Sequence, residues 1–289
     1  MTVSIDVAAR TVDTATGRIG YQRGGSGPTL VYLHSAAGEG PGLEFLWHAA
    51  ERFDVVAPAF PGFWGSEGIE ELDDMEDVVF HLTDMFDRLE LDRPIVSGLS
   101  FGGWMAAELA SRYPDRLAGL VLVNAVGLHV DGARVGDIFG RSPAAMVDDL
   151  FEDRNHPMAQ LALGLDGHWH DPARFGDMPF DAVRPLIQHL AAVARLAWNP
   201  YLHNPRLARR LGRITVQTLV VASASDRLVP LAHAEAYAAG IPGARLAVVP
   251  GAHLLPVERP AELTALVADF AAGLSSHMNV GPRGRENAH

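Results

Sequence analysis

The chain has 289 residues, of which 48% are hydrophobic and 20% charged, so it can build a packed core and is not a disordered protein. Its 35 acidic residues outnumber 23 basic ones, and the net charge of −12 argues against nucleic acid as a partner. The sequence contains neither Lys nor Cys. This composition excludes Schiff-base and P-loop lysines, disulfides, thiol nucleophiles and cysteine-based metal sites.

Targeting signals are not evident. The N-terminal residues include Asp6 and lack a continuous apolar run, which argues against a signal peptide. No apolar stretch approaches the roughly 18 residues that a membrane span requires. We therefore expect a cytoplasmic protein with no membrane partner, and the sequence carries no signal that indicates its oligomeric state.

Strand-like and helix-like segments alternate over residues 1–124. Short apolar runs typical of strands buried on both faces are separated by segments with helical periodicity. This alternation predicts an α/β fold with a mostly parallel central sheet and helices on both faces. The expected strands are 18–23, 29–33, 54–59, 94–99 and 117–124, and the expected helices are 42–52, 73–91 and 101–113.

The alternation stops at residue 125 and resumes only near residue 214. The segment 125–213 has no convincing buried strand, and its apolar residues recur at helical spacing, which predicts a helical cap inserted in the sheet domain. The core is then expected to comprise 1–124 and 214–274, followed by a polar, disordered tail at 275–289. The later core elements are strands at 218–222 and 245–249 and helices near 232–239 and 259–274, and the cap stripe includes Leu186, Leu190, Val193 and Ala197.

Ser100 is the strongest candidate for a nucleophile. It lies in Gly98-Leu99-Ser100-Phe101-Gly102, a G-x-S-x-G pattern at the junction of an expected strand and an expected helix. Glycines are needed there because side chains on either side of such a tight turn would collide. The turn exposes the hydroxyl at a helix N-terminus, where developing negative charge is stabilised. The alternative is that Ser100 only caps the helix.

A nucleophilic serine needs a base and a carboxylate that orients the base. Asp226 follows the expected strand 218–222, and His253 follows the expected strand 245–249. The carboxyl ends of parallel strands meet at one edge of a sheet, so both side chains are expected near Ser100. Taken singly, Asp226 could be a helix cap and His253 a solvated loop residue. Their joint placement favours a Ser-Asp-His triad.

Together these motifs resemble the α/β-hydrolase fold superfamily, in its capped single-domain branch, over about residues 18–274. The resemblance implies a cap inserted after the sixth strand. The family's H-G-x loop is similar to His34-Ser35-Ala36, with Ser35 in place of the usual Gly. By this resemblance, the backbone amides of Ala36 and Phe101 form the oxyanion hole.

The family's P-G-x-G-x-S loop resembles residues 61–66, with Trp64 in place of a Gly. Trp64 either fills space or walls the substrate pocket. Ser35 and Leu254 are the other expected pocket residues, and the Ser35 hydroxyl is available to contribute a hydrogen bond. Ser223 replaces the Gly three residues before the acid.

The resemblance implies hydrolysis of a small or medium carboxylic ester or lactone, without a cofactor, by a Ser100-His253-Asp226 triad. Relatives that cleave haloalkanes or epoxides use Asp at the position of Ser100, which argues against those reactions. Hydrolysis of a C–C bond in a meta-cleavage-type diketone is the alternative, although such enzymes usually carry Trp where this chain has Leu254. A non-turnover small-molecule receptor is an alternative of another class. Each hypothesis makes a small molecule the partner.

Residues 168–171, His-Trp-His-Asp, contain side chains that can bind a metal ion. A His-x-His pair on a helix points its rings to different faces, and no third ligand follows at a suitable spacing. We therefore expect no metal ion.

Overall fold

A computed structural model describes residues 7–169 and 180–278 of the chain. The strands form one sheet in the order β1-β2-β4-β3-β5-β6-β7-β8, which is parallel from β4 to β8, whereas β1 and β2 are antiparallel. The predicted α/β architecture is confirmed. The strands are β1 Ala8–Asp13, β2 Arg18–Gly25, β3 Thr29–Leu33, β4 Asp54–Pro58, β5 Ile95–Leu99, β6 Gly119–Val123, β7 Thr218–Ser223 and β8 Arg245–Val249.

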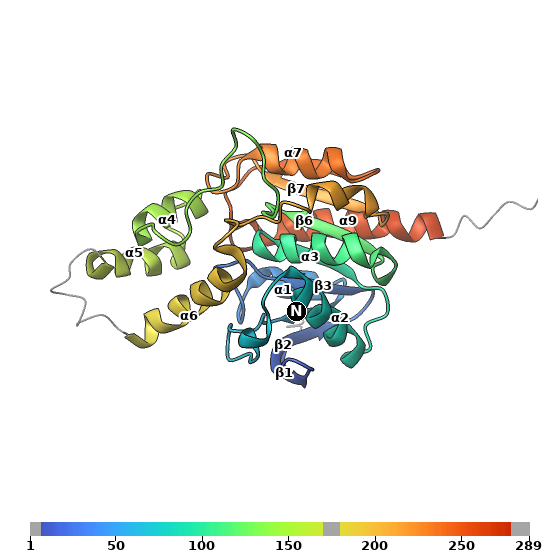
Figure 1. Ribbon diagram of the computed structural model, residues 1–289, viewed down its shortest axis with the longest axis horizontal. Helices are drawn as coiled ribbons and strands as arrows, with labels where there is room; N and C mark the ends of the chain where they lie inside the picture. The colour runs from blue at the N-terminus through green and yellow to red at the C-terminus, as the bar shows by residue number, and fades with distance from the viewer. Residues whose placement is uncertain (1–6, 170–179, 279–289) are drawn as a thin grey trace, which may run out of the picture.

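Helices cover both faces of the sheet, as Figure 1 shows. The central strands are buried on both faces because successive side chains point to opposite sides. In β6, Leu120 and Leu122 join one core cluster, whereas Val121 and Val123 join the other. One face is covered by α2 Met75–Arg88, α3 Phe101–Arg112 and α7 Leu231–Gly240, and the other by α1 Glu44–Ala50, α8 Leu255–Glu258 and α9 Pro260–Met278.

Two elements differ from the predictions: one strand that was not predicted and one helix that ends later than expected. The strand β1 was not predicted, because its side chains are mostly exposed at the sheet edge and it pairs only with β2. A strand with one neighbour and no buried face lacks the apolar signal that identifies central strands. The helix α9 extends through Met278, so the expected tail does not begin at residue 275. Residues 279–289 lie outside the described part of the chain.

The segment between β6 and β7 is helical, as predicted. It contains α4 Pro143–Leu150, α5 Pro157–Trp169, α6 Phe180–Ala197 and the short 3-10 helix η4 Ala208–Arg213. Figure 1 shows α4, α5 and the start of α6 projecting beyond one end of the sheet. Across the described ranges, no helix is both long and apolar enough to cross a membrane.

Candidate active site

Ser100 occupies a sharp turn between β5 and α3. Its backbone has φ 54° and ψ −111°, a region that non-glycine residues rarely adopt. A Cβ at Gly98 would collide with the carbonyl oxygen of Gly102, and one at Gly102 would collide with that of Leu33. Both positions therefore require glycine, and the turn holds Ser100 at the N-terminus of α3.

Asp226 and His253 form a buried pair. The Nδ1–H of His253 donates to Oδ2 of Asp226 at 2.8 Å, and each side chain is only 2% exposed. The other carboxylate oxygen, Oδ1, accepts from the backbone N–H groups of Leu228 and Val229 at 2.9 and 2.8 Å. The carboxylate is thus fixed on both sides, and this tautomer leaves Nε2 of His253 as an acceptor.

Asn124 connects the strand ends that carry this pair. Its Nδ2 donates to Oγ of Ser223 and to the carbonyl oxygen of His253, both at 2.9 Å, and its Oδ1 accepts from the Ser223 N–H at 2.8 Å. The side chain is buried at the end of β6. Sequence reasoning treated Asn124 only as the last residue of a strand. A polar residue closing a buried strand on the carboxyl edge was the available signal.

His34 begins the loop that follows β3. Its Nδ1–H donates to the Ser35 carbonyl at 2.8 Å, and its Nε2 accepts from the Phe60 N–H at 3.0 Å. Burial lowers the pKa of the ring, although the charge of Glu39 opposes this shift. The imidazole is therefore neutral, and its two nitrogens connect the loop after β3 to the loop after β4.

Two backbone amides close to Ser100 in the chain or in the cavity have no protein acceptor within the described residues. Ala36 lines the same pocket as Ser100, and within the described residues its N–H has no protein acceptor. Phe101 is the first residue of α3, so its N–H has no partner inside the helix. These are the two amides that the sequence analysis expected to form the oxyanion hole.

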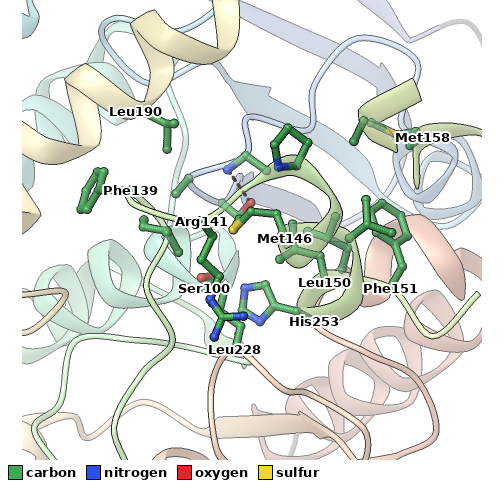
Figure 2. Close-up of a pocket in the computed structure, with 18 of the residues that line it drawn as sticks. Ser100, Phe139, Arg141, Met146, Leu150, Phe151, Met158, Leu190, Leu228 and His253 are labelled. Atoms are coloured by element: carbon green, nitrogen blue, oxygen red, sulfur yellow. Dashed lines mark hydrogen bonds between the residues drawn. The ribbon is translucent and has the colours of Figure 1, made fainter. Parts of the chain in front are cut away.

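Ser100 and His253 line a cavity of about 270 Å³ between the sheet edge and the cap. In Figure 2 their side chains lie together, with Phe139 and Leu190 on one side of the view and Leu150 and Phe151 on the other. Most of the lining is apolar. Leu190, which belongs to the apolar stripe of the cap, lines this cavity. The cap contributes Ile138, Phe139, Arg141, Pro143, Met146, Val147, Leu150, Phe151, Met158, Leu161, Ala162, Leu190 and Leu202.

The expected pocket residues separate into two places. Ser35 and Leu254 line the cavity with Ser100, but Trp64 lines another cavity of about 230 Å³ beside β2 and β4. The indole Nε1–H donates to the Gly38 carbonyl at 2.7 Å. Trp64 has φ 49°, and this backbone conformation sets the direction of its side chain. Trp64 is thus not among the described residues that line the cavity of Ser100.

Arg141 is the one residue with a permanent charge among the described residues that line the cavity of Ser100. Figure 2 shows its guanidinium directed toward the region of Ser100 and His253. An Nη1 atom lies 2.7 Å from Oδ2 of Asp149. Burial raises the pKa of Asp149, and the charge of Arg141 opposes that rise. Sequence reasoning missed Arg141, because the cap has no motif that marks it.

His189 joins the cap to the loop after β3. It lies on α6, is 3% exposed, and stacks on Phe63 with 4.2 Å between the ring centroids. Burial lowers the pKa of its ring to about 4; the nearby ring of His34 adds to this shift, and a hydrogen bond to the backbone of Ala37 opposes it. The cap therefore contacts the loop through a neutral imidazole.

This histidine predicts a stability change with pH. The ordinary histidine pKa is about 6.5, so between pH 6.5 and about 4 the unfolded chain binds a proton at His189 that the folded chain does not. Folding stability therefore falls as the pH is lowered through this window. We expect the drop in thermal midpoint between pH 6.5 and 4.5, measured by calorimetry, to be smaller in His189→Gln than in the wild type. Equal drops would contradict the assignment.

The metal hypothesis has no support among the described residues, where no group of three or more His, Asp or Glu side chains is placed to hold an ion. Residues 170 and 171 of the His-Trp-His-Asp segment lie outside the described ranges.

The comparisons with known proteins agree with this fold. The profile of the alpha/beta hydrolase fold family matches residues 28–260, and the chain belongs to this family. It is 28% identical over 269 residues to a 2-hydroxymuconate semialdehyde hydrolase of Pseudomonas sp. (strain CF600), covering 86% of this chain and 88% of the relative. It is 29% identical over 268 residues to a 2-hydroxy-6-oxo-6-phenylhexa-2,4-dienoate hydrolase of Burkholderia cepacia, covering 88% and 91%.

A solved structure gives the same result for the fold. The 2-hydroxy-6-oxo-6-phenylhexa-2,4-dienoate hydrolase from Rhodococcus sp. strain RHA1 superposes with a TM-score of 0.72 at 22% identity, over 93% of this chain and 99% of that chain. This chain is therefore an α/β-hydrolase enzyme, similar in sequence to a semialdehyde hydrolase and a dienoate hydrolase.

Proposed function

We propose that the protein is a serine hydrolase that cleaves a C–C bond in an acidic, meta-cleavage-type diketone. The observation that carries this proposal is Arg141, a cation in an otherwise apolar cavity that also contains Ser100 and His253. A guanidinium in such a place suits a carboxylate, because it offers parallel N–H donors in a low-dielectric setting. The names of the two relatives denote carboxylic acids, which supports the same substrate class. The main expectation from the sequence, ester hydrolysis, is therefore the second candidate.

The proposed reaction uses the buried pair and the two amides. The Ser100 Oγ adds to the ketone carbon, its proton passes to Nε2 of His253, and the carbonyl oxygen becomes an alkoxide held by the Ala36 and Phe101 amides. The alkoxide collapses, the C–C bond breaks, and the carbon leaving group takes the proton from His253. Water, deprotonated by His253, then hydrolyses the acyl-enzyme. Asp226 stabilises the imidazolium in both steps.

The test is turnover of a 2-hydroxy-6-oxo-dienoate against p-nitrophenyl esters of short acids. We expect kcat/KM for the dienoate to exceed that for each ester by at least about 10-fold. Efficient ester turnover without dienoate cleavage would reject the C–C reaction and support the second candidate. A stoichiometric burst without steady turnover on either substrate would support the receptor alternative.

The Arg141→Gln variant tests whether Arg141 binds the carboxylate of the substrate. A charge-assisted hydrogen bond contributes about 1.5–3 kcal/mol, so kcat/KM for the dienoate is expected to fall by roughly 10- to 100-fold. Turnover of a neutral p-nitrophenyl ester should stay within about threefold, since it has no carboxylate. Steady-state kinetics on both substrates checks this result.

Asp149→Asn is the matched control, because it removes the partner of Arg141 but keeps the guanidinium. We expect this variant to retain the preference for the acid. Equal losses on both substrates in Arg141→Gln would mean that Arg141 supports the cap and does not read the carboxylate.

Carboxylic ester or lactone hydrolysis is favoured by one observation. Leu254 follows His253 and lines the cavity, where C–C hydrolases that resemble this chain usually carry Trp. An aliphatic side chain there leaves the pocket beside the nucleophile apolar, which suits a small or medium acyl group. The same triad and amides would perform this reaction, with an alkoxide in place of the carbon leaving group.

A further inference from the structure

A buried carboxylate lies behind the loop that carries Ala36. Glu39 is 5% exposed, and its Oε1 accepts from the Tyr32 hydroxyl and from the Ser35 N–H, both at 2.8 Å. Its Oε2 accepts from the Ser35 Oγ at 2.6 Å. Burial raises the pKa of Tyr32 well above its ordinary value, and the negative charge of Glu39 adds to this shift, so the phenol remains a donor. All three hydrogen bonds are donated to Glu39, so both of its carboxylate oxygens serve as acceptors.

This carboxylate has no cationic partner. Across residues 7–169 and 180–278, none of the ion pairs involves Glu39. The nearby His34 is neutral, because burial lowers its pKa. Placing a carboxylate in the interior is costly unless hydrogen bonds satisfy it, and two of the three here come from Ser35. The interactions of Glu39 are therefore concentrated on one loop residue.

Most backbone N–H groups of the loop Ser35–Gly38 donate to acceptors within the protein. The Ser35 N–H donates to Glu39, the Ala37 N–H donates to the Ser35 Oγ at 3.0 Å, and the Gly38 N–H donates to the Ser35 carbonyl at 3.1 Å. The amide of Ala36 alone among these neighbours has no protein acceptor in the described chain. The hydrogen bonds around Ser35 thus leave a single N–H to face the cavity.

Ser35 relays the effect of Glu39 through its hydroxyl. Because Oγ accepts from the Ala37 N–H, its own proton goes to Glu39, and the side chain connects the residues on both sides of Ala36. The α/β-hydrolase family usually has glycine at this position, which has no hydroxyl to bond with Glu39 or with the Ala37 N–H. The serine and the glutamate therefore act as a pair.

From this arrangement we propose that Ser35 and Glu39 are positioning residues that aim the Ala36 amide at the oxyanion. The inference rests on the proposed role of Ser100 as nucleophile. Neither side chain touches the reacting atoms in this proposal. The pair holds the Ser35–Gly38 turn in the conformation in which the Ala36 N–H is free, so its contribution appears only when negative charge develops on the substrate oxygen.

The experiment compares two inhibitors that differ in charge when bound. The first is 1,1,1-trifluoro-4-phenylbutan-2-one, whose carbonyl carbon accepts the Ser100 Oγ; the serine proton passes to His253 and the carbonyl oxygen becomes an alkoxide. The second is 4-phenylbutan-2-one, which binds as an uncharged ketone. Each inhibition constant is measured by competition with a p-nitrophenyl ester or with the dienoate, whichever the wild type hydrolyses. The ratio of the two constants reports stabilisation of the oxyanion separately from binding of the phenylalkyl group.

The test variants are Glu39→Gln and Ser35→Ala. In Glu39→Gln the amide oxygen can still accept from Tyr32 and from the Ser35 N–H, but the NH2 group cannot accept from the Ser35 hydroxyl. In Ser35→Ala that hydroxyl is lost. Removing one oxyanion donor outright lowers kcat by roughly 10²- to 10³-fold, so misaiming one should lower kcat by about 10- to 100-fold. We expect the trifluoromethyl ketone to bind weaker by the same factor, whereas the affinity for the methyl ketone and KM change by less than about threefold.

Glu108→Gln is the matched control. Glu108 is also a fully buried glutamate, but it pairs with Arg112 and accepts from Trp104 and Asn204 on the outer part of α3, away from the loop. This variant should lower the thermal midpoint without changing the ratio of the two inhibition constants. The control separates general destabilisation from loss of positioning.

The outcomes distinguish failure of the serine mechanism from failure of the positioning role of Ser35 and Glu39. If the wild type does not bind the trifluoromethyl ketone more tightly than the methyl ketone, the proposed serine mechanism fails. If the wild type shows the difference but both variants keep the wild-type ratio, the positioning role is overturned. If Glu39→Gln does not fold, Ser35→Ala decides alone, because it removes one hydroxyl and leaves the Glu39 carboxylate and its bond from Tyr32 in place.

Discussion

Replacing Ser100 by Ala is expected to lower turnover by a factor of roughly 10³ to 10⁶, the range for removal of a triad nucleophile. The loss follows from the absence of an oxygen that can form the acyl-enzyme, while the amides and the cavity still bind the substrate. An organophosphonate or fluorosulfonyl reagent should add once to the wild type and not at all to this variant. Peptide mapping by mass spectrometry should place the label on Ser100.

The stability of this variant should hardly change. Ser100 has φ 54°, a strained conformation, and its side chain accepts no hydrogen bond from the start of α3. A thermal midpoint within a few degrees of the wild type is therefore expected. Ser97→Ala serves as a control that keeps the labelling, because Ser97 is a buried serine on β5, the strand before Ser100, and its Oγ has no partner within the described chain. Labelling elsewhere would show that Ser100 is not the nucleophile, and loss of activity with gross unfolding would show that its role is structural.

Asp226→Asn should lower kcat by about 10⁴-fold, which is the effect known for this change in a serine protease triad. The backbone fixes how the new amide sits. Its Oδ1 is needed by the N–H groups of Leu228 and Val229, so its NH2 must face Nδ1 of His253. Nδ1 then becomes an acceptor and Nε2 carries the proton, which prevents the imidazole from taking the proton of Ser100.

The measurement is steady-state kcat on the better substrate, together with labelling by the phosphonate. Asp148→Asn is a suitable control, since Asp148 is only partly buried and pairs with Arg154 of the cap. Labelling of Asp226→Asn should be slow but should still occur at Ser100. Near-normal turnover in Asp226→Asn would indicate that another acid orients the histidine.

The elements that sequence reasoning predicted well are those defined by burial on both sides. The central strands β3 to β7 are short and mostly apolar, and the loops at their carboxyl ends could be assigned to one edge of the sheet from the sequence. The edge strand β1 escaped prediction because one neighbour and an exposed surface impose little pattern on its residues. The pattern therefore identified the centre of the sheet and not its edge.

Side-chain partners far apart in the sequence were the harder part of the site. Asn124 reaches Ser223 and His253 across three strand ends, and no local pattern indicates such a contact. Arg141 lines the cavity only because the cap folds over Ser100. Trp64 lines a different cavity from Ser100, and the motif around it left its place open. Motifs describe local backbone well, whereas a pocket wall depends on how distant segments pack.

The attachment of α4 to the loop after β8 bears on any attempt to dissect this protein. The Leu254 N–H donates to the Leu150 carbonyl at 3.2 Å, and the Glu258 carboxylate accepts from the Glu152 and Asp153 amides at 2.8 and 3.1 Å. Leu254 is the neighbour of His253 along the chain. Excising residues 125–213, or grafting a homologous insert in their place, would cut these bonds and release the histidine loop. The insert is continuous in sequence, but its helix α4 is held by hydrogen bonds to the segment that carries His253.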